Sequence, residues 1–252
     1  MKILFTICGR AGSKGIANKN IRPFLGKLLP YYSLSAIDLY IKNYGKEGDV
    51  YDIALSTDSP ELIDMIENNP FRPAVIIERS AELAGDTIGK KDVILDCGVR
   101  TEAIKGYEYD MYVDLDITSP LRTKEDVAAL INKHIETGAD ITYSVTSARR
   151  NPYFNQVMRG ENGFRKVCQA DFTARQQAPV VYDMNASLYA YSPSHLKAGG
   201  GFNEGYFEAI EMYDTAVLDL DHENDFELME IIAGYLFDNK DEFREIYENI
   251  PQ

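Results

Sequence analysis

A loop with the composition of an anion-binding site lies near the start of the chain: CGRAGSKGIANKNIR, residues 8–22. Its three glycines let backbone amides approach a ligand closely, and consecutive amides in such a loop form a nest for anions. Cationic side chains surround them: Arg10, Lys14, Lys19 and Arg22. Arginine can donate two hydrogen bonds to one phosphate, whereas lysine offers a mobile point charge. Several cations on one loop predict a ligand with more than one phosphate.

The glycine spacing of this loop, G-xx-G-xx-G, differs from two common phosphate-binding motifs. It is not a Walker A loop, because no glycine-lysine-serine or glycine-lysine-threonine follows at the required distance. It is also not the dinucleotide-binding fingerprint, whose glycines are spaced differently. A simpler alternative is a glycine-rich turn with solvated lysines, and Lys19 taken alone is equally compatible with that interpretation.

A pair of carboxylates lies near the other end of the chain, where Asp219 and Asp221 flank Leu220 in the segment AVLDLD. Residues two apart in a strand point to the same side, and two adjacent carboxylates repel unless a cation lies between them. Mg²⁺ binds one or two carboxylates together with phosphate oxygens, so the pair suits a site for a metal–triphosphate complex. The alternative is the acidic end of a strand in an acidic protein.

The elements that must position these groups follow an alternating pattern. Short apolar runs predict strands over 3–8, 51–59, 74–77, 111–116, 140–145, 185–192 and 216–221. Segments with helical periodicity lie over 30–44, after Ser59, over 88–105, after Thr123, and over 223–237 and 240–248. This alternation predicts an α/β fold with a doubly wound, mostly parallel, Rossmann-like sheet. Ligands of such sheets bind beyond the carboxyl ends of the strands, where the opening loop should lie.

The length and composition set further bounds. A chain of 252 residues fits a single domain over 1–252, in which the irregular, polar segment 147–182 is an inserted excursion. A net charge of −14 disfavours general binding to nucleic acids and anionic membranes. Cys8, Cys97 and Cys168 stand far apart, which favours reduced thiols over a metal site. No stretch has the pattern of a signal peptide or membrane span, so we expect a cytoplasmic protein.

The opening stretch GRAGSKGIANKNIRPFLGKLL resembles the signature of the acylneuraminate cytidylyltransferase family, whose members make CMP-activated nonulosonic acids such as CMP-sialic acid. Five further segments resemble family motifs in the same order: STDSPEL, ERSAELAGDT, DITSPLRT, RQQAPVVYDMNASLYAY and LDLDHENDF. Each segment alone is weak, but the ordered set is specific and spans nearly the whole chain. The resemblance implies a fold of the nucleotide-diphospho-sugar transferase type and a homodimer formed through the excursion.

The implied reaction is nucleotidyl transfer, in which the anomeric hydroxyl of a 2-keto sugar acid attacks the α-phosphate of CTP and pyrophosphate leaves. Such chemistry needs charge neutralisation and in-line placement more than covalent help. The resemblance assigns the triphosphate to Arg10, Lys14 and Lys19 as catalytic residues, and the nucleotide to these and to Gly12, Ser13, Asn20, Arg79 and Asp86. It assigns Mg²⁺ to Asp219 and Asp221. The general base stays open between Asp221 and a metal-bound group.

The resemblance assigns the acceptor sugar acid to Arg175, Gln176, Asn185 and Asp116. Arg175 would bind the acceptor carboxylate, although a salt bridge in the dimer is an alternative. The sequence also departs from the family pattern. Asp116 replaces a glutamine, Asp183 replaces an arginine that is frequent in sialic acid enzymes, and Gly9 replaces an alanine, which we expect only to loosen the loop. After Asn185, Ala186 and Ser187 replace the usual glycine and alanine.

These departures leave the CTP-binding motifs intact and the identity of the acceptor open among legionaminic, pseudaminic and other sugar acids. Two other functions are compatible with the fold: transfer from another nucleotide or to another acceptor, and nucleotide binding without turnover. The second is disfavoured, because binding alone does not require the carboxylate pair together with the lysines of the loop.

Overall fold

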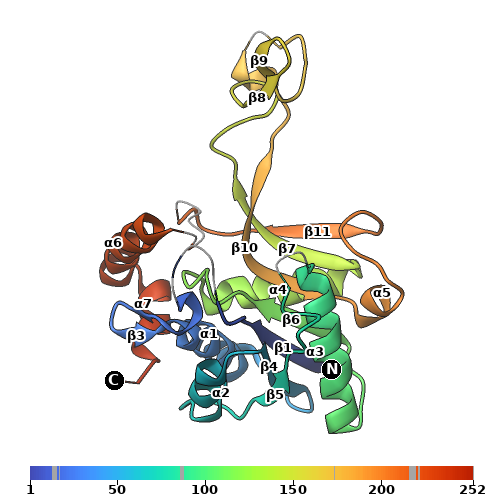
Figure 1. The fold of residues 1–252 in the computed structure, drawn as a ribbon, viewed down its shortest axis with the longest axis vertical. Helices are drawn as coiled ribbons and strands as arrows, with labels where there is room; N and C mark the ends of the chain where they lie inside the picture. The colour runs from blue at the N-terminus through green and yellow to red at the C-terminus, as the bar shows by residue number, and fades with distance from the viewer. Residues whose placement is uncertain are drawn as a thin grey trace.

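The computed structural model describes residues 1–12, 16, 18–85, 88–172, 174–215, 220 and 222–251, with Arg175 described by its backbone only. Its centre is a seven-stranded sheet (Figure 1). The strands lie in the order β11 (Phe207–Glu211), β7 (Ile141–Ser147), β10 (Tyr182–Tyr191), β6 (Met111–Leu115), β1 (Lys2–Cys8), β4 (Val50–Thr57) and β5 (Val75–Glu78). Strand β10 is antiparallel to β6 and β7, whereas β11–β7, β6–β1, β1–β4 and β4–β5 are parallel pairs. The predicted α/β fold with a mostly parallel sheet is therefore confirmed.

Two hydrophobic cores cover the two faces of the sheet. The larger core packs the sheet against α1 (Leu29–Tyr44), α2 (Pro60–Glu67), α4 (Lys124–Thr137), α6 (Glu223–Asn239) and α7 (Asp241–Glu248). The smaller core packs it against α3 (Lys90–Lys105) and α5 (Pro193–Lys197). Successive strand residues point to opposite faces, so Phe5 and Ile7 belong to the larger core and Leu4 to the smaller one.

The starts of the predicted helices follow from side-chain caps. Ser59 accepts a hydrogen bond from the backbone N–H of Leu62 at the start of α2, with Pro60 in the first turn. Thr123 and Asp126 form a reciprocal capping box at the start of α4, the helix that the sequence predicts after Thr123. Asp225 accepts from the N–H of His222 at 2.8 Å, as part of the capping box at the start of α6.

Short strands account for most of the differences from the predicted elements. The edge strand β11 and the small pairs β2 (Pro23–Phe24) with β3 (Lys27–Leu28) and β8 (Val157–Gly160) with β9 (Gly163–Lys166) were not predicted. Their five or fewer residues leave too few alternations to show a period. The predicted strand over 216–221 lies outside the described residues, apart from the buried Leu220.

Helix α3 lies unusually close to β6 because Gly98 faces the ring of Tyr112. A Cβ atom at Gly98 would stand 2.4 Å from Cζ of Tyr112, so no larger residue fits without movement of the backbone or the ring. The Tyr112 hydroxyl donates a hydrogen bond to Oε1 of Glu102 one turn further along α3. This contact fixes α3 against the sheet, and the first residue of the helix, Lys90, then reaches the carboxyl end of β6.

An arm leaves the sheet between β7 and β10 and carries the β8–β9 hairpin at its tip, at the top of Figure 1. It corresponds to the segment 147–182 that the sequence marks as an excursion. The arm exposes large apolar side chains along its length: Val157, Met158, Phe164, Val167 and Val180. Across the described residues, no helix is long and apolar enough to cross a membrane.

Candidate active site

The topology of the sheet places one candidate site. From β1 the chain order proceeds to β4 and β5 on one side, whereas β6 pairs with β1 on the other side. Ligands of open α/β sheets bind at the carboxyl ends of the strands where the order reverses in this way. We call this region the switch edge; it comprises the carboxyl ends of β1 and β6 and the segments 9–22 and 116–122 that follow them.

The opening loop is tied to its neighbours through both backbone and side chains. The N–H of Gly9 donates to the carbonyl of Ser56 at 3.1 Å, and Nδ2 of Asn20 donates to the carbonyl of Arg10 at 3.0 Å. The N–H of Ala11 donates to Oδ1 of Asp58 at 2.7 Å. The Asp58 carboxylate, which follows β4, thus accepts a hydrogen bond from one of the backbone amides that the sequence predicts as an anion-binding nest. The side chain of Asn20 stabilises the loop through its hydrogen bond to the Arg10 carbonyl.

Two further residues of this loop have the conformations that its glycines and asparagines permit. Gly12 has a φ of 67°, and Asn18, which precedes the short helix Lys19–Ile21, has a φ of 54°. Arg10 and Lys19 belong to the described parts of this loop, before and after residues 13–15 in the sequence. Of the other loop residues assigned to the nucleotide, Ser13 and Lys14 lie outside the described residues.

Gly9 does more than loosen the loop, contrary to the expectation from its replacement of alanine. A Cβ atom at this position would stand 2.6 Å from Cδ2 of Leu62 and 2.9 Å from Cδ1 of Ile117. The glycine therefore lets the loop pack closely between α2 and the segment after β6. An alanine here would require both side chains to move.

The side chain of Arg22 contacts α6, although its charge and its position in the loop suggest a phosphate-binding residue. Its Nη1 forms an ion pair with Oε2 of Glu223 at 2.5 Å, and its guanidinium lies 4.1 Å from the centre of the Phe226 ring. The N–H of Leu25 donates to Oε1 of Glu230 on the same helix. The end of the opening loop is thus fastened to the first two turns of α6. Arg22 is a link between the two segments in this structure rather than a cation open to phosphate.

A cluster of three charges occupies the carboxyl end of β6. Nζ of Lys90 lies 2.6 Å from Oδ2 of Asp114 and 2.6 Å from Oδ2 of Asp116. Thr6 on β1 donates to the other oxygen of Asp114, and the N–H and hydroxyl of Thr118 both donate to Oδ1 of Asp116. The predicted acceptor residue Asp116 is therefore at the switch edge, held between an ammonium group and a turn.

The electrostatic interactions in this cluster keep Asp116 and Lys90 charged. Burial alone would raise the pKa of Asp116, but the Lys90 ammonium and the hydrogen bonds from Thr118 lower it to about 2. Burial alone would lower the pKa of Lys90, and the two carboxylates instead raise it well above its ordinary value. Asp116 is therefore fully ionised at neutral pH.

Arg122 holds the segment that begins at Asp116. Its side chain is completely buried, and its guanidinium donates to the carbonyls of Asp116 and Ser119 and to the hydroxyl of Ser33. Burial lowers its pKa to about 10, so it remains protonated at neutral pH. The arginine of the DITSPLRT motif thus fixes the backbone of the segment that begins at Asp116, through hydrogen bonds to its carbonyl groups.

The side chain of Asn185 forms hydrogen bonds that stabilise the sheet. Its Oδ1 accepts from the hydroxyl of Ser144 on β7, and its Nδ2 donates to Sδ of Met212 at 3.3 Å. The register of β10 against β7 shifts between Met184 and Tyr189, and the bulge contains Ala186 with a φ of 51°. The buried carboxamide therefore stabilises a bulge; its assignment to the acceptor stays a prediction.

We expect Ala186→Gly to stabilise the protein by about 1 kcal/mol, because a left-handed conformation strains residues with a Cβ atom by roughly that amount. Urea unfolding would measure the change as a higher midpoint at an unchanged slope. Ala190→Gly is the matched control: Ala190 lies in the same strand, is fully buried and is paired in register with Val113, so glycine there should destabilise. A lower midpoint for Ala186→Gly would contradict the strain argument.

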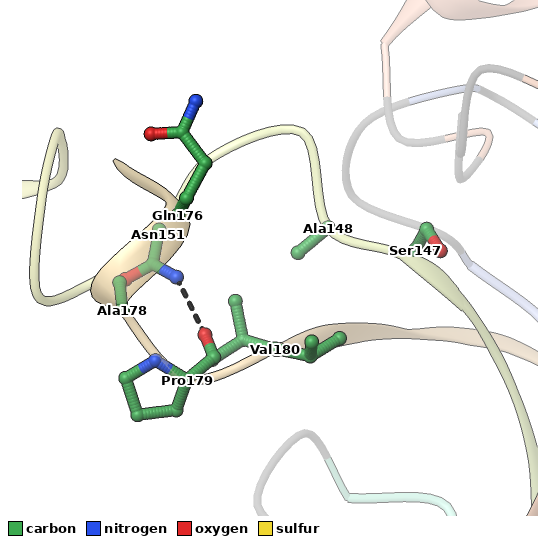
Figure 2. A pocket seen from close by; sticks show the side chains of 8 residues that line it. Ser147, Ala148, Asn151, Gln176, Ala178, Pro179 and Val180 are labelled. Atoms are coloured by element: carbon green, nitrogen blue, oxygen red, sulfur yellow. Dashed lines mark hydrogen bonds between the residues drawn. The ribbon is translucent and has the colours of Figure 1, made fainter. Parts of the chain in front are cut away.

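Gln176 lies apart from the switch edge, at the base of the arm. It lines a cavity of about 480 Å³ whose walls are the segments 147–151 and 176–181 (Figure 2). Nδ2 of Asn151 donates to the carbonyl of Pro179 at 2.9 Å and holds the two walls together. None of the cavity's lining residues belongs to the switch edge. The backbone of Arg175 is at the same base, in the short helix Arg175–Gln177, and its side chain is not described.

The remaining predicted residues divide into two groups. Arg79 follows β5 and donates from Nη2 to the carbonyl of Ser56 at 2.8 Å, so it lies one strand away from the opening loop. Asp86, Asp219 and Asp221 lie outside the described residues. Among the residues that are described, no group of three or more histidine, cysteine, aspartate or glutamate side chains could hold a metal ion.

Two members of the charge cluster, Lys90 and Asp114, were not predicted from the sequence, nor was the structural role of Arg122. A signal for the cluster existed in Asp114 and Asp116, which stand two apart in a predicted strand and so require a cation between them, as Asp219 and Asp221 do. The sequence does not show that this cation is Lys90, because Lys90 belongs to α3 and only the folded structure brings α3 to the carboxyl end of β6.

Residues 4–230 match the cytidylyltransferase family, and the chain belongs to this family. It is thus a nucleotidyltransferase, and the resemblance drawn from the sequence motifs is confirmed. Two similar relatives are the CMP-N,N'-diacetyllegionaminic acid synthase of Campylobacter jejuni and the post-translational flagellin modification protein B of Campylobacter coli. The first is 34% identical over 92% of this chain and 95% of the relative, and the second is 33% identical over 92% and 94%.

Solved structures share the fold at low sequence identity. The structure of a CMP:2-keto-3-deoxy-manno-octonic acid synthetase complexed with CTP has a TM-score of 0.64 and 14% identity, and the alignment covers 93% of this chain and 99% of the other. The 4-diphosphocytidyl-2C-methyl-D-erythritol synthase of Anaerococcus prevotii has a TM-score of 0.57 and 12% identity over 93% and 97%. These similarities establish the nucleotidyltransferase type of fold.

Proposed function

We propose that this protein transfers CMP from CTP to a nonulosonic acid, with release of pyrophosphate. The family match, together with relatives whose names specify legionaminic, pseudaminic and N-acylneuraminic acids, supports this acceptor class. The observation in the structure that carries the proposal is the contact of Arg22 with Glu223 and Phe226. This contact holds the end of the cationic loop against the first turn of α6. Helix α6 begins at Glu223, two residues after Asp221 in the sequence.

The chemistry requires neutralisation of the triphosphate and alignment of the acceptor hydroxyl with the α-phosphate. In the proposal Arg10, Lys14 and Lys19 bind the phosphate oxygens and stabilise the charge that moves onto pyrophosphate as the bond to the α-phosphate breaks. Gly12 and Ser13 bring backbone amides to the phosphates. Asn20 keeps the loop in this shape through its bond to the Arg10 carbonyl, and Arg79 and Asp86 contact the base.

The carboxylate pair Asp219 and Asp221 fits Mg²⁺ by the chemistry of its donors, because hard cations prefer carboxylate oxygens shared with phosphate. When bound, Mg²⁺ would supply additional charge stabilisation on the triphosphate. Leu220, which stands between them in the sequence, is fully buried. Asp221 or a group held by the metal would take the proton of the acceptor hydroxyl.

The acceptor side of the proposed site consists of Asp116 at the switch edge, Asn185 in the bulge of β10, and Arg175 and Gln176 at the base of the arm. We further propose that the chain is one unit over 1–252 and that 147–182 forms the contact of a homodimer. The exposed apolar side chains of the arm support a contact of that kind. The reaction would take place in the cytoplasm, because it consumes CTP.

A matrix of nucleotides against acceptors tests the function directly. CTP, UTP, ATP and GTP are each combined with Mg²⁺ and with N,N'-diacetyllegionaminic, pseudaminic, N-acetylneuraminic or 2-keto-3-deoxy-manno-octonic acid, and pyrophosphate release is followed. We expect turnover with CTP and one or more of the three nine-carbon acids, and none after chelation of the metal. Preference for another nucleotide, or release that does not depend on any acid, would contradict the proposal.

A further inference from the structure

We propose that Lys90 and Asp116 form a recognition pair for the uncharged polar groups of the acceptor, its hydroxyl and acylamino groups, and that Lys90 thereby determines acceptor specificity. The inference rests on the proposed function and adds to it a residue of α3 and the kind of substituent that the residue recognises. It is carried by the geometry of the pair at the switch edge.

Burial divides the charge cluster into an inner and an outer half. The side chain of Asp114 is 0% exposed, whereas those of Asp116 and Lys90 are 21% and 32% exposed. The contact with Asp114 is therefore internal to the protein. The Lys90–Asp116 contact lies at the carboxyl end of β6, where a ligand of this sheet can reach it.

The hydrogen bonds of the pair leave capacity on both partners. Oδ1 of Asp116 accepts two hydrogen bonds from Thr118, whereas Oδ2 accepts one from Lys90 and has a second lone pair. The ammonium group has three donors; it donates one hydrogen bond to Asp116 and forms an ion pair with Asp114, and the ring centre of Tyr189 is 5.5 Å from Nζ. With respect to the described residues, one acceptor and one donor thus lie side by side, which matches a hydroxyl group or an amide.

The charges of the cluster disfavour a carboxylate as the bound group. Two carboxylates in direct contact with Lys90 already exceed its single charge. The nearby guanidinium of Arg79 donates to Ser56, and that of Arg122 donates to loop carbonyls and to Ser33. Burial raises the pKa of Cys8 and of Tyr191, which also face the cluster, so both are neutral at pH 7. Neutral polar substituents are the groups that this arrangement favours.

The pair is also preorganised, which a specificity site requires. Arg122 fixes the backbone of Asp116 from below, and the close packing of α3 at Gly98 fixes the helix that presents Lys90. Both side chains are held before a ligand arrives, so little rotamer entropy is lost on binding.

Separate Michaelis constants for the two substrates test the pair. The variants are Lys90→Met, Lys90→Arg and Asp116→Asn, assayed with CTP and N,N'-diacetyllegionaminic acid. We expect Asp116→Asn and Lys90→Met to raise KM for the sugar acid by roughly tenfold or more, since each removes a charge-assisted hydrogen bond. KM for CTP should change by less than about twofold, and Lys90→Arg should lie between the wild type and Lys90→Met, because its charge is kept.

Asp116→Asn leaves the Lys90–Asp114 ion pair in place, so it decides the question even if Lys90→Met fails to fold. Lys91→Met is the matched control: Lys91 is the next residue of the same helix, it donates to the carbonyl of Gly199, and it should not change either constant. An unchanged KM for the sugar acid in Asp116→Asn, or an equal rise for both substrates, would overturn the inference. Absence of turnover by the wild type with every sugar acid would instead refute the proposed function.

Discussion

Replacement of Asp219 or Asp221 by alanine should reduce turnover with CTP and Mg²⁺ by about a thousandfold or more. A bound metal contributes several kcal/mol to stabilising the transferring phosphoryl group, and each 1.36 kcal/mol corresponds to a tenfold change in rate. The loss should appear in kcat rather than in KM for the sugar acid. Pyrophosphate release with CTP and the acid found to be the best acceptor measures it.

The control for this prediction is His222→Ala, which changes the residue directly after the pair and should keep activity within about twofold of the wild type. Asp219→Ala and Asp221→Ala should also unfold at nearly the wild-type urea concentration, because removal of one of two adjacent carboxylates relieves repulsion in the absence of metal. Near-normal turnover in either variant would show that the pair does not hold the metal.

Arg122→Met should destabilise the protein by about 3–5 kcal/mol, because it removes a buried cation from polar partners that are left without a donor. The fully buried guanidinium donates to the carbonyls of Asp116 and Ser119 and to the hydroxyl of Ser33. Urea unfolding monitored by far-ultraviolet circular dichroism would report the change in midpoint.

Two further variants separate the buried network from charge alone. Arg122→Lys keeps the charge but cannot donate in a planar fork to three oxygens, so it should also destabilise the fold. Arg100→Met removes a half-exposed arginine that pairs with Asp96 on the surface of α3, and its effect should stay below about 1 kcal/mol. Equal effects of Arg122→Met and Arg100→Met would contradict the role assigned to the buried guanidinium.

Much of the fold could be predicted because its signals are local. The run from Ile3 to Cys8 and the capping residues Ser59 and Thr123 specify their elements within a few positions in the chain. The antiparallel direction of β10 could not be predicted in this way, since it depends on where the chain returns after the arm. The same applies to β11, whose alternation is too short to indicate a strand.

The candidate site could be predicted to the extent that its residues lie within one motif. The opening loop and the position of Asp116 follow from the order of the strands. The partners of Arg22 and Asp116 could not be predicted, because Glu223 and Lys90 reach them from distant elements. Arg22 illustrates the physical reason: its charge indicates an anion, but only the packing of α6 shows that the anion is a side chain of the protein.

The fastening of the opening loop to α6 has a consequence for how the enzyme is made. In a polypeptide still emerging from the ribosome, the opening loop is present long before Glu223, Phe226 and Glu230 are synthesised. The loop then lacks the partners that hold its end, and Phe24 lacks the ring of Phe226 that lies 5.6 Å away in the finished protein. We therefore expect the end of the opening loop to take its final position only after α6 has been synthesised.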